Sequence, residues 1–311
     1  MEYTEILKAL QEQINTYFVG KEEVVDDVLT CLLAGGHILI EDVPGVGKTT
    51  LARTLARSID ASFARIQFTP DTLPGDVVGM SVYDMKSGDF SYKEGAIMHQ
   101  LILADEINRT PPKTQASLLE AMAEGQVSVD GKTYALPRPF LVIATQNPVE
   151  FLGTYPLPEA QIDRFMMRLS IGYPDAEEEI RMAQNHMQKK TAETAAPVCS
   201  AEDILKLREA VENVHVSEAL LTYIREIVAA TRMEKRFVLG ASPRAMLNLI
   251  AASRARACLC GRDFVKPDDV KAVALQVLHH RLVLTAEGRI GGEDPDSILK
   301  GLILKVKVPM E

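Results

Sequence analysis

Hydrophobic residues follow two different spacings along the first 175 residues of the chain. Short runs that are apolar at nearly every position alternate with longer stretches in which apolar residues recur three or four positions apart. The first pattern is typical of strands buried on both faces of a parallel sheet, and the second is typical of helices that cover such a sheet. The sequence therefore predicts an α/β fold in which helices lie on both faces of a parallel sheet.

We predict five strands, at residues 38–41, 63–68, 101–104, 140–145 and 168–171. Helical spacing covers residues 1–34 with an interruption at 18–21, then resumes after the first strand and again from Thr110 to Gly125. The turn Asp130-Gly131 lies between two alternating segments and predicts a β-hairpin at about 126–136. Residues 71–98 are long for a loop, so we expect an insertion with short elements of its own.

Strand signals nearly vanish after Asp175, and helical spacing dominates the rest of the chain. We therefore place a boundary near Pro174, with an α/β domain at 1–173 and a helical domain at 174–311. Residues 189–200, rich in Thr, Ala, Pro and Ser, are expected to form an exposed connection inside the second domain.

The first predicted strand runs into a glycine-rich turn and then a helix. The segment is Asp42-Val43-Pro44-Gly45-Val46-Gly47-Lys48-Thr49-Thr50. Such a turn binds a polyphosphate, because its N–H groups and the helix N-terminus face the anion. Lys48 would reach the terminal phosphates, and Thr49 would supply a hydroxyl to Mg²⁺. Asp42 stands where the usual pattern has its first glycine. The preceding strand favours a nucleotide site over an ordinary turn.

Two carboxylates, Asp105 and Glu106, directly follow the buried strand at 101–104. Transfer of a γ-phosphoryl group to water needs a magnesium ion, neutralised phosphate charge and an activated water. Asp105 could hold the magnesium ion and Glu106 could polarise the water. Adjacent acids after a strand are often only a solvated turn, but here they share a sheet with the glycine-rich turn, which favours chemistry.

Asn147 ends the strand predicted at 140–145. Its side-chain amide could orient the attacking water or contact the γ-phosphate. Asn147 also precedes Pro148, and Asn-Pro is an ordinary turn. The residues alone leave both interpretations open.

Composition and charge narrow the class of protein. The chain has 311 residues, a formal net charge of −9 and ordinary fractions of hydrophobic and charged residues. The acidic balance is evidence against binding a nucleic-acid backbone, although an acidic chain can carry a local basic stripe. No apolar run approaches the ~20 residues of a membrane span, and the start of the chain lacks the pattern of a signal peptide, so we expect a cytoplasmic protein. The cysteines lack metal-site spacing and are expected to be free thiols.

Several motifs together resemble the MoxR family of AAA+ ATPases, in the clade with an insert in helix 2, and the resemblance covers essentially the whole chain. That family commonly has Asp at the position of Asp42. The motifs that carry the resemblance are Ile40–Thr49, Ala104–Arg109, Ala144–Pro148, Pro158–Phe165, Gly240–Arg244, Val265–Val270 and His280–Leu282.

The resemblance implies a P-loop AAA+ core followed by an all-helical lid domain, with ATP and Mg²⁺ as ligands. Asp42–Thr50 would bind the nucleotide, Thr49 and Asp105 the metal, and Val19 and Gly20 the adenine. Glu106 would be the base and Asn147 the first sensor.

Two arginines receive roles only from the resemblance. Arg164 would be an arginine finger that reaches the site of the neighbouring subunit, and Arg244 a second sensor for the γ-phosphate of its own subunit. Arg164 could instead pair with Asp163 on a surface turn, and Arg244 could be a surface residue at a helix N-terminus. Arg109 is a weaker candidate for a second interface arginine.

A finger acting in trans would make catalysis depend on assembly. The resemblance thus implies a homo-oligomeric ring, expected to be hexameric, with the insert and the hairpin toward its pore. The ring would remodel, mature or metallate a client protein, with a von Willebrand factor A-domain protein as a separate partner. Alternatives are a DNA-remodelling motor or magnesium-chelatase-like subunit, a small-molecule phosphotransferase, and a nucleotide-gated switch.

Overall fold

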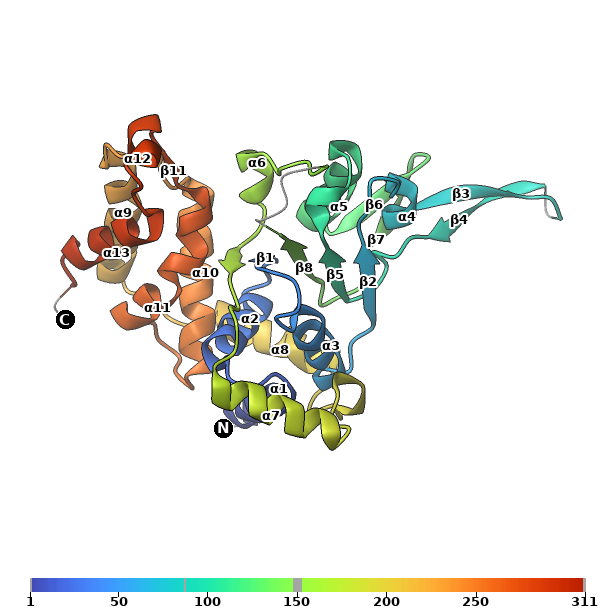
Figure 1. Ribbon diagram of the computed structural model, residues 1–311, viewed down its shortest axis with the longest axis horizontal. Coiled ribbons are helices and arrows are strands. Elements are labelled where there is room, and N and C mark those ends of the chain that lie inside the picture. Colours follow the sequence, from blue (N-terminus) through green and yellow to red (C-terminus); the bar gives the residue numbers. More distant parts are fainter. Residues whose placement is uncertain (1, 87, 148–152, 310–311) are drawn as a thin grey trace.

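A five-stranded sheet lies at the centre of the molecule, between a group of helices from the second half of the chain and a long two-stranded arm (Figure 1). The computed structural model describes residues 2–86, 88–147 and 153–309. Its strand order is β2-β5-β8-β1-β9, and every neighbouring pair is parallel. This confirms the predicted parallel sheet. The strands are β1 (Ile38–Glu41), β2 (Phe63–Gln67), β5 (Leu101–Asp105), β8 (Leu141–Gln146) and β9 (Met167–Leu169).

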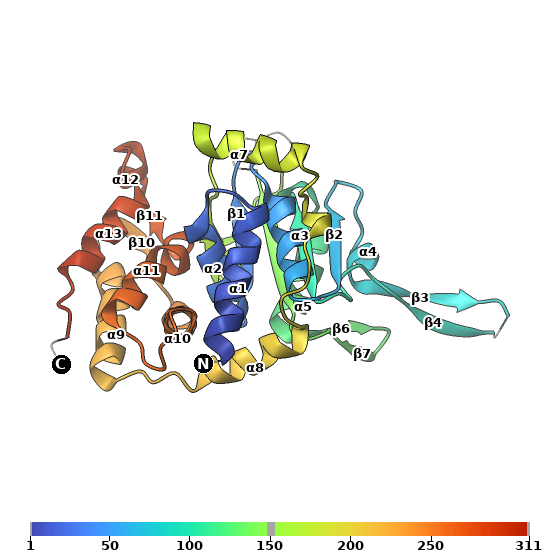
Figure 2. The same cartoon turned by 90° about the horizontal axis from the view of Figure 1, so that it is seen from below.

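Successive side chains of the central strands enter two different hydrophobic clusters, because a strand points alternate residues to opposite faces. Ile38 and Ile40 pack in one cluster, and Leu39 between them packs in the other. The first cluster is formed with α1, α2 and α3, and the second with α4 and α5 (Figure 2). These helices are α1 (Glu2–Tyr17), α2 (Glu22–Leu33), α3 (Lys48–Ser58), α4 (Pro74–Val78) and α5 (Pro112–Glu124).

Helices dominate the second half of the chain as predicted. A two-stranded antiparallel ribbon, β10 (Phe237–Leu239) with β11 (Val283–Leu284), also forms there, and such short strands leave no readable alternation in the sequence. In the described part of the chain, no helix has the length and apolarity needed to cross a membrane. The helices are α7 (Ala176–Met187), η2 (Ala192–Thr194), α8 (Ala201–Glu212), α9 (Glu218–Met233), α10 (Pro243–Leu259), α11 (Pro267–Leu278), η3 (His279–Arg281), α12 (Ala286–Ile290) and α13 (Pro295–Lys305).

Chain contacts continue across Pro174, so the proposed boundary there stays a prediction. The amide of Asn185 in α7 donates to the carbonyl of Thr16 in α1 at 3.0 Å. Arg208 of α8 donates to the carbonyl of Leu32 in α2 at 2.9 Å. One hydrophobic cluster also joins α1–α3 to α8–α11.

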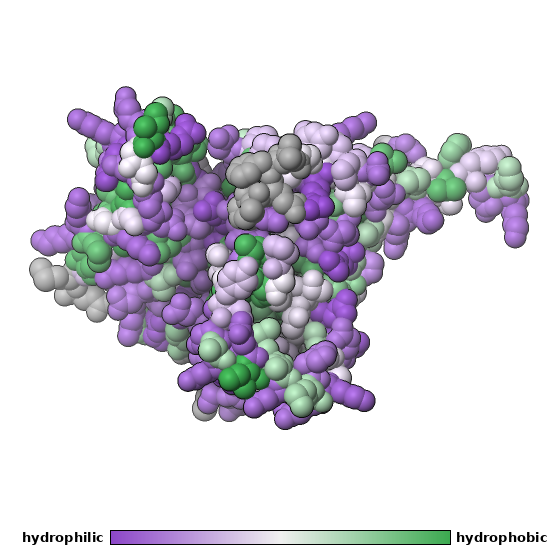
Figure 3. Space-filling model, viewed as in Figure 1, coloured by the Kyte–Doolittle hydropathy of each residue, from purple (hydrophilic) through white to green (hydrophobic). Residues whose placement is uncertain are grey.

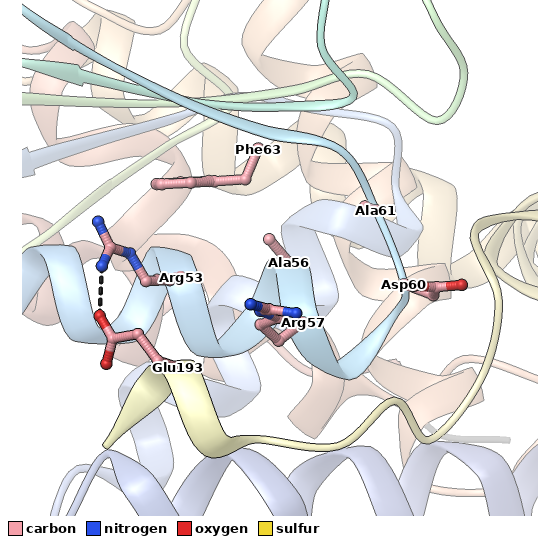
Figure 4. Close-up of a pocket in the computed structure, with 7 residues that line it drawn as sticks. All are labelled: Arg53, Ala56, Arg57, Asp60, Ala61, Phe63 and Glu193. Atoms are coloured by element: carbon pink, nitrogen blue, oxygen red, sulfur yellow. Dashed lines mark hydrogen bonds and ion pairs between the residues drawn. The ribbon is translucent and has the colours of Figure 1, made fainter.

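The segment 189–200, which we expected to be an exposed connection inside the second domain, packs against α3. The N–H groups of Val198 and Cys199 both donate to the carbonyl of Ser58. Glu193 contacts Arg53, whose guanidinium lies 5.8 Å from the centre of the Phe63 ring (Figure 4). This packing could not be predicted from the sequence, because the residues of the segment that become buried, including Ala192 and Ala195, are small and leave no hydrophobic pattern.

Two hairpins extend from the sheet on the side of α5. The insertion forms α4 and the arm, β3 (Gly79–Asp84) with β4 (Asp89–Glu94), and the second hairpin pairs β6 (Gln126–Val129) with β7 (Lys132–Ala135). Tyr92 of the arm stacks on Tyr134 of the second hairpin with ring centres 4.0 Å apart. The arm exposes hydrophobic side chains along its length (Figure 3), namely Met80, Val82, Tyr83, Met85 and Phe90.

Asp27 of α2 faces helices α10 and α11. Burial raises the pKa of Asp27 to about 7, although Arg256 and a hydrogen bond from Gln276 act to lower it. At pH values between the ordinary pKa of 3.8 and 7, the folded chain keeps a proton on Asp27 that the unfolded chain has lost. The free energy of unfolding therefore falls as the pH rises through this window.

We expect Asp27→Asn to raise the free energy of unfolding at pH 8 by on the order of 2 kcal/mol, because the variant no longer buries a carboxylate charge there. The gain should disappear at about pH 3, below the ordinary pKa of 3.8, where both states hold the proton. Urea unfolding at the two pH values measures it. Asp26→Asn is the control: it weakens the 2.7 Å bond from Arg256 and should destabilise at pH 8. Equal loss of stability at both pH values in Asp27→Asn would contradict the assignment.

Candidate active site

The turn between β1 and α3 has the backbone shape of a phosphate-binding loop. Gly45 and Gly47 have φ values of 89° and 92°, a left-handed conformation that favours glycine. Gly47 caps α3, so the first N–H groups of that helix face the turn. The ammonium group of Lys48 donates to the carbonyl oxygen of Asp42 across the turn at 2.6 Å.

Asp42, the departure from the usual loop pattern, binds the protein's own backbone. Its carboxylate accepts hydrogen bonds from the N–H of Val43 at 2.8 Å, of Ile171 at 2.6 Å and of Gly172 at 2.7 Å. The hydroxyl of Ser170 adds a bond at 3.2 Å. Burial opposes ionisation of this 7%-exposed residue, but the backbone donors outweigh it and hold the pKa of Asp42 below its ordinary value. Asp42 thereby fastens the turn to the segment that follows β9.

The sheet brings nine of the predicted site residues to one cavity of about 360 Å³, and five of them carry the side chains predicted to act on the phosphates, the metal or the water. They follow three neighbouring strands, β1, β8 and β5, whose carboxyl ends share one edge of the sheet. The five are Lys48, Thr49, Asp105, Glu106 and Asn147, and the other lining residues are Pro44, Gly45, Gly47, Thr50 and Arg65. Of the run Ala144–Pro148, Pro148 lies outside the described residues.

Asp105 is held by two polar side chains that sequence reasoning did not single out. One carboxylate oxygen accepts from Nε and Nη2 of Arg65 at 3.1 and 2.6 Å, and the other accepts from the Thr145 hydroxyl at 2.5 Å. Arg65 and Gln67 alternate with apolar residues on β2, a pattern that could have pointed to their position beside β5.

Carboxylate and hydroxyl oxygens at Asp105 and Thr49 suit Mg²⁺, which prefers hard oxygen ligands. No cluster of three or more His, Cys, Asp or Glu side chains suited to a metal occurs among the residues that the structure describes. The donor set therefore fits an ion that takes most of its ligands from phosphate and water, as Mg²⁺ commonly does beside a nucleotide.

Glu106 adopts a left-handed backbone conformation, with φ of 58°, that is uncommon outside glycine. Its N–H donates to the Thr145 hydroxyl at 2.9 Å. Its carboxylate oxygen Oε2 accepts from the Gln67 amide at 2.9 Å and pairs with Arg109 Nε at 3.1 Å. Such local strain is typical of functional sites, and here surrounding bonds fix the direction of a single carboxylate.

A smaller cavity of about 70 Å³ also adjoins the glycine-rich turn and shares Gly45, Gly47 and Thr50 with the first. Val19 lines it opposite Val46, and Ile171 and Met182 add further apolar surface. Gly20 beside it has φ of +82°, and a Cβ there would lie 2.1 Å from the Glu178 side chain, so only glycine fits. An apolar slot next to a phosphate loop suits a purine ring.

Arg164 and Arg244 do not line the cavity of their own chain. The Asp163 carboxylate accepts from Arg281 Nε at 2.6 Å, and the role of Arg164 stays a prediction. Arg164 itself is half-buried after α6 (Glu159–Ile162), and Arg244 is exposed in the first turn of α10, which Ser242 caps.

Comparisons with known proteins agree with this geometry. The family model described as "ATPase family associated with various cellular activities (AAA)" matches residues 37–167, and the model described as "AAA lid domain" matches residues 229–301. The crystal structure of a Cytophaga hutchinsonii protein superposes with a TM-score of 0.93 at 40% identity, over 99% of this chain and 96% of that chain.

Named relatives cover nearly the whole chain. Chaperone MoxR1 of Mycobacterium tuberculosis is 42% identical over 96% of this chain and 81% of its own length. Protein MoxR of Paracoccus denitrificans is 31% identical over 88% of this chain and 87% of its own length. A Bacillus subtilis relative, named Uncharacterized protein YeaC, is 49% identical over 96% of this chain and 94% of its own length.

The parallel sheet, the phosphate loop and the two matched domains define an AAA+ ATPase fold with a C-terminal lid. Within that class, the similarity to the MoxR proteins over most of the chain is decisive. The chain belongs to the MoxR family.

We expect Asp42→Asn to lower the free energy of unfolding by about 1–3 kcal/mol and to weaken nucleotide binding, because an amide cannot accept all the bonds of the carboxylate. A carboxyl with a depressed pKa stabilises the fold above its ordinary pKa of 3.8 and loses this effect as the pH falls through the folded value. The difference from wild type should therefore shrink below about pH 4.

Denaturant unfolding across pH and titration with a fluorescent nucleotide measure both effects. Asp60→Asn is the matched control, because Asp60 is exposed and its φ of 47° is acceptable to asparagine. An Asp42→Asn variant as stable as this control at pH 8 would refute the anchoring role.

Proposed function

We propose that this MoxR protein hydrolyses ATP in the cavity between the phosphate loop and the ends of β5 and β8. The observation that carries the proposal is the convergence of Lys48, Thr49, Asp105, Glu106 and Asn147 on one cavity. A phosphate loop alone would support nucleotide binding, whereas the added carboxylates and amide supply what transfer of a phosphoryl group to water requires.

The loop N–H groups, the N-terminus of α3 and Lys48 would hold the β- and γ-phosphates. Thr49 and Asp105 would hold Mg²⁺, which neutralises phosphate charge. Glu106 would accept a proton from the water as it attacks the γ-phosphorus, and the bond to the ADP oxygen breaks. Among the described residues, Gln67 and Arg109 both bind Oε2 of Glu106. The other carboxylate oxygen, Oε1, would therefore face the water. Asn147 would orient that water.

The positions of the two arginines support assembly into a ring. Phosphoryl transfer gains from a cation beside the γ-phosphate, and neither Arg164 nor Arg244 lines the cavity of its own chain. We propose that Arg164 enters the site of the next subunit in a hexameric ring, and that Arg244 reaches its own site when the lid helices approach. Val19 and Gly20 would contact the adenine, and Arg109 could add a second contact at the interface.

The mechanical output would act on a client protein, in line with the name Chaperone MoxR1 of a relative. Remodelling, maturation or metal insertion, a von Willebrand factor A-domain partner chain, and a cytoplasmic location belong to this proposal. The net charge of −9 supports a protein client over a DNA strand.

Glu106→Gln should bind ATP about as well as wild type but hydrolyse it about 10²–10⁴-fold more slowly, because the amide cannot take the proton. Phosphate release and ATP titration measure the two quantities. Glu120→Gln, on the exposed side of α5, is the control and should keep full activity. Wild-type hydrolysis by the Glu106→Gln protein would remove Glu106 from the mechanism.

Arg164→Ala should lower kcat by about 10³-fold or more with little change in ATP affinity, because the arginine acts on the transition state in a neighbour. Wild-type activity per subunit should rise with protein concentration. Arg181→Ala, exposed on α7, is the control. A fully active monomer, or an unaffected Arg164→Ala, would favour the phosphotransferase alternative, and salt-sensitive stimulation by DNA would favour the DNA motor.

A further inference from the structure

The turn formed by residues 163–166, which carries Arg164, is held by one buried side chain of the lid. Arg281 of η3 is 3% exposed in its side chain, and it donates to three oxygens of this turn besides the Asp163 carboxylate. Its Nη2 reaches the carbonyls of Phe165 at 2.7 Å and Asp163 at 3.3 Å, and its Nη1 reaches that of Met166 at 3.2 Å. Nη1 also donates to the carbonyl of Val277, at the end of α11.

A neighbouring histidine, His280, adds a hydrogen bond to the same turn. Nε2 of His280 lies 3.2 Å from the carbonyl oxygen of Phe165, and since a carbonyl only accepts, His280 must donate from Nε2. Burial and the adjacent Arg281 hold the pKa of His280 well below its ordinary value, so the imidazole is neutral. Phe165 is also fully buried, so the backbone on the C-terminal side of Arg164 is fixed while its own side chain is half-buried.

The same short helix η3 is bound to the ends of the strands that carry the site. Arg168 of β9 donates to Nε2 of His279 at 2.9 Å and pairs with Glu41 at the end of β1 at 2.9 Å. Gln146, at the end of β8 and next to Asn147, donates to Glu41. His279 in turn pairs with Asp296 of α13 at 3.0 Å. Polar contacts thus run from the cavity edge through η3 to the turn that carries Arg164.

We infer that Arg281 is a positioning residue, which orients Arg164 of its own subunit toward the ATP site of the next subunit and makes that orientation depend on the place of its own lid. The inference rests on the proposed role of Arg164 in trans. Consequently, a substitution at Arg281 should impair ATP hydrolysis in the neighbouring subunit, whereas the ATP site of the substituted subunit remains complete.

Arg281→Lys keeps the charge but loses the planar set of donors that serves several oxygens at once. We expect kcat to fall at least about 10-fold with an ATP affinity near that of wild type. Mixing supplies the test: the variant is combined in equal amounts with Glu106→Gln subunits, which have a dead site but an intact Arg164 and Arg281. Subunit exchange is followed by mass photometry and activity by phosphate release.

In a closed ring with random order, the mixture should recover about a quarter of the wild-type rate per subunit, since half the sites are intact and half of these receive an intact neighbour. The Arg164→Ala variant, mixed in the same way, tests the proposed function itself. If this mixture recovers no activity, the proposed role of Arg164 in the neighbouring site is wrong. If the Arg164→Ala mixture recovers activity but the Arg281→Lys mixture does not, Arg281→Lys impairs its own site or its folding, and the inference is overturned. Full activity of Arg281→Lys alone also overturns it.

Asp163→Asn provides a milder variant should Arg281→Lys not fold, because it weakens one acceptor of Arg281 and leaves the backbone carbonyls. It should show a smaller loss of kcat that also recovers on mixing. Arg208→Lys is the matched control: Arg208 is likewise an arginine that ties a helix of the second half to the first, but it binds α2 and not the turn. Arg208→Lys should leave kcat unchanged. If Arg208→Lys lowered kcat and this loss recovered on mixing, the specific role of Arg281 would be refuted.

Discussion

The hydrogen bonds between the Asp42 carboxylate and the N–H groups of Ile171 and Gly172 are the constraint on which the site depends. They join the phosphate loop, at the end of β1, to the backbone that leads from β9 to α7. The apolar slot is lined by residues of both segments, so the distance across it is fixed by one buried charge. A glycine in place of Asp42 would leave the loop shape intact but remove this connection.

Charged side chains connect the two halves of the chain, and of these Arg281 is buried and Arg256 is half-buried. Arg281 and Arg256 each bind an aspartate of the other half, and Arg281 also satisfies backbone carbonyls. A buried ion pair contributes little stability compared with apolar packing, but breaking one partner leaves an uncompensated charge and is costly. These contacts therefore restrict the lid to positions relative to the sheet in which each charge keeps its partner. Such a restriction is consistent with a lid that adopts a few defined positions.

Much of the fold could be predicted because β1, β5 and β8 are buried on both faces and their residues are apolar up to their carboxyl ends. The phosphate loop and the pair Asp105 and Glu106 were accessible for the same reason, since their chemistry is local in the chain. Arg281 binds residues more than a hundred positions away, and nothing in its neighbourhood marks that contact. Gln67 and the segment over α3 were missed because their partners lie in other elements, and β10 and β11 were too short to show alternation.

Helix α5 connects two regions that are separate in the sequence analysis. It begins just after Glu106 and Arg109, is bound at Thr114 to the carbonyl of Thr72 before α4, and ends at Gly125, where β6 starts. A helix of 13 residues is about 20 Å long, so a tilt of ~10° at its first turn displaces its last turn by about 3 Å. A change in the backbone around Glu106 would in this way be enlarged at the hairpins, and most of all at the tip of the arm, beyond the Tyr92–Tyr134 stack.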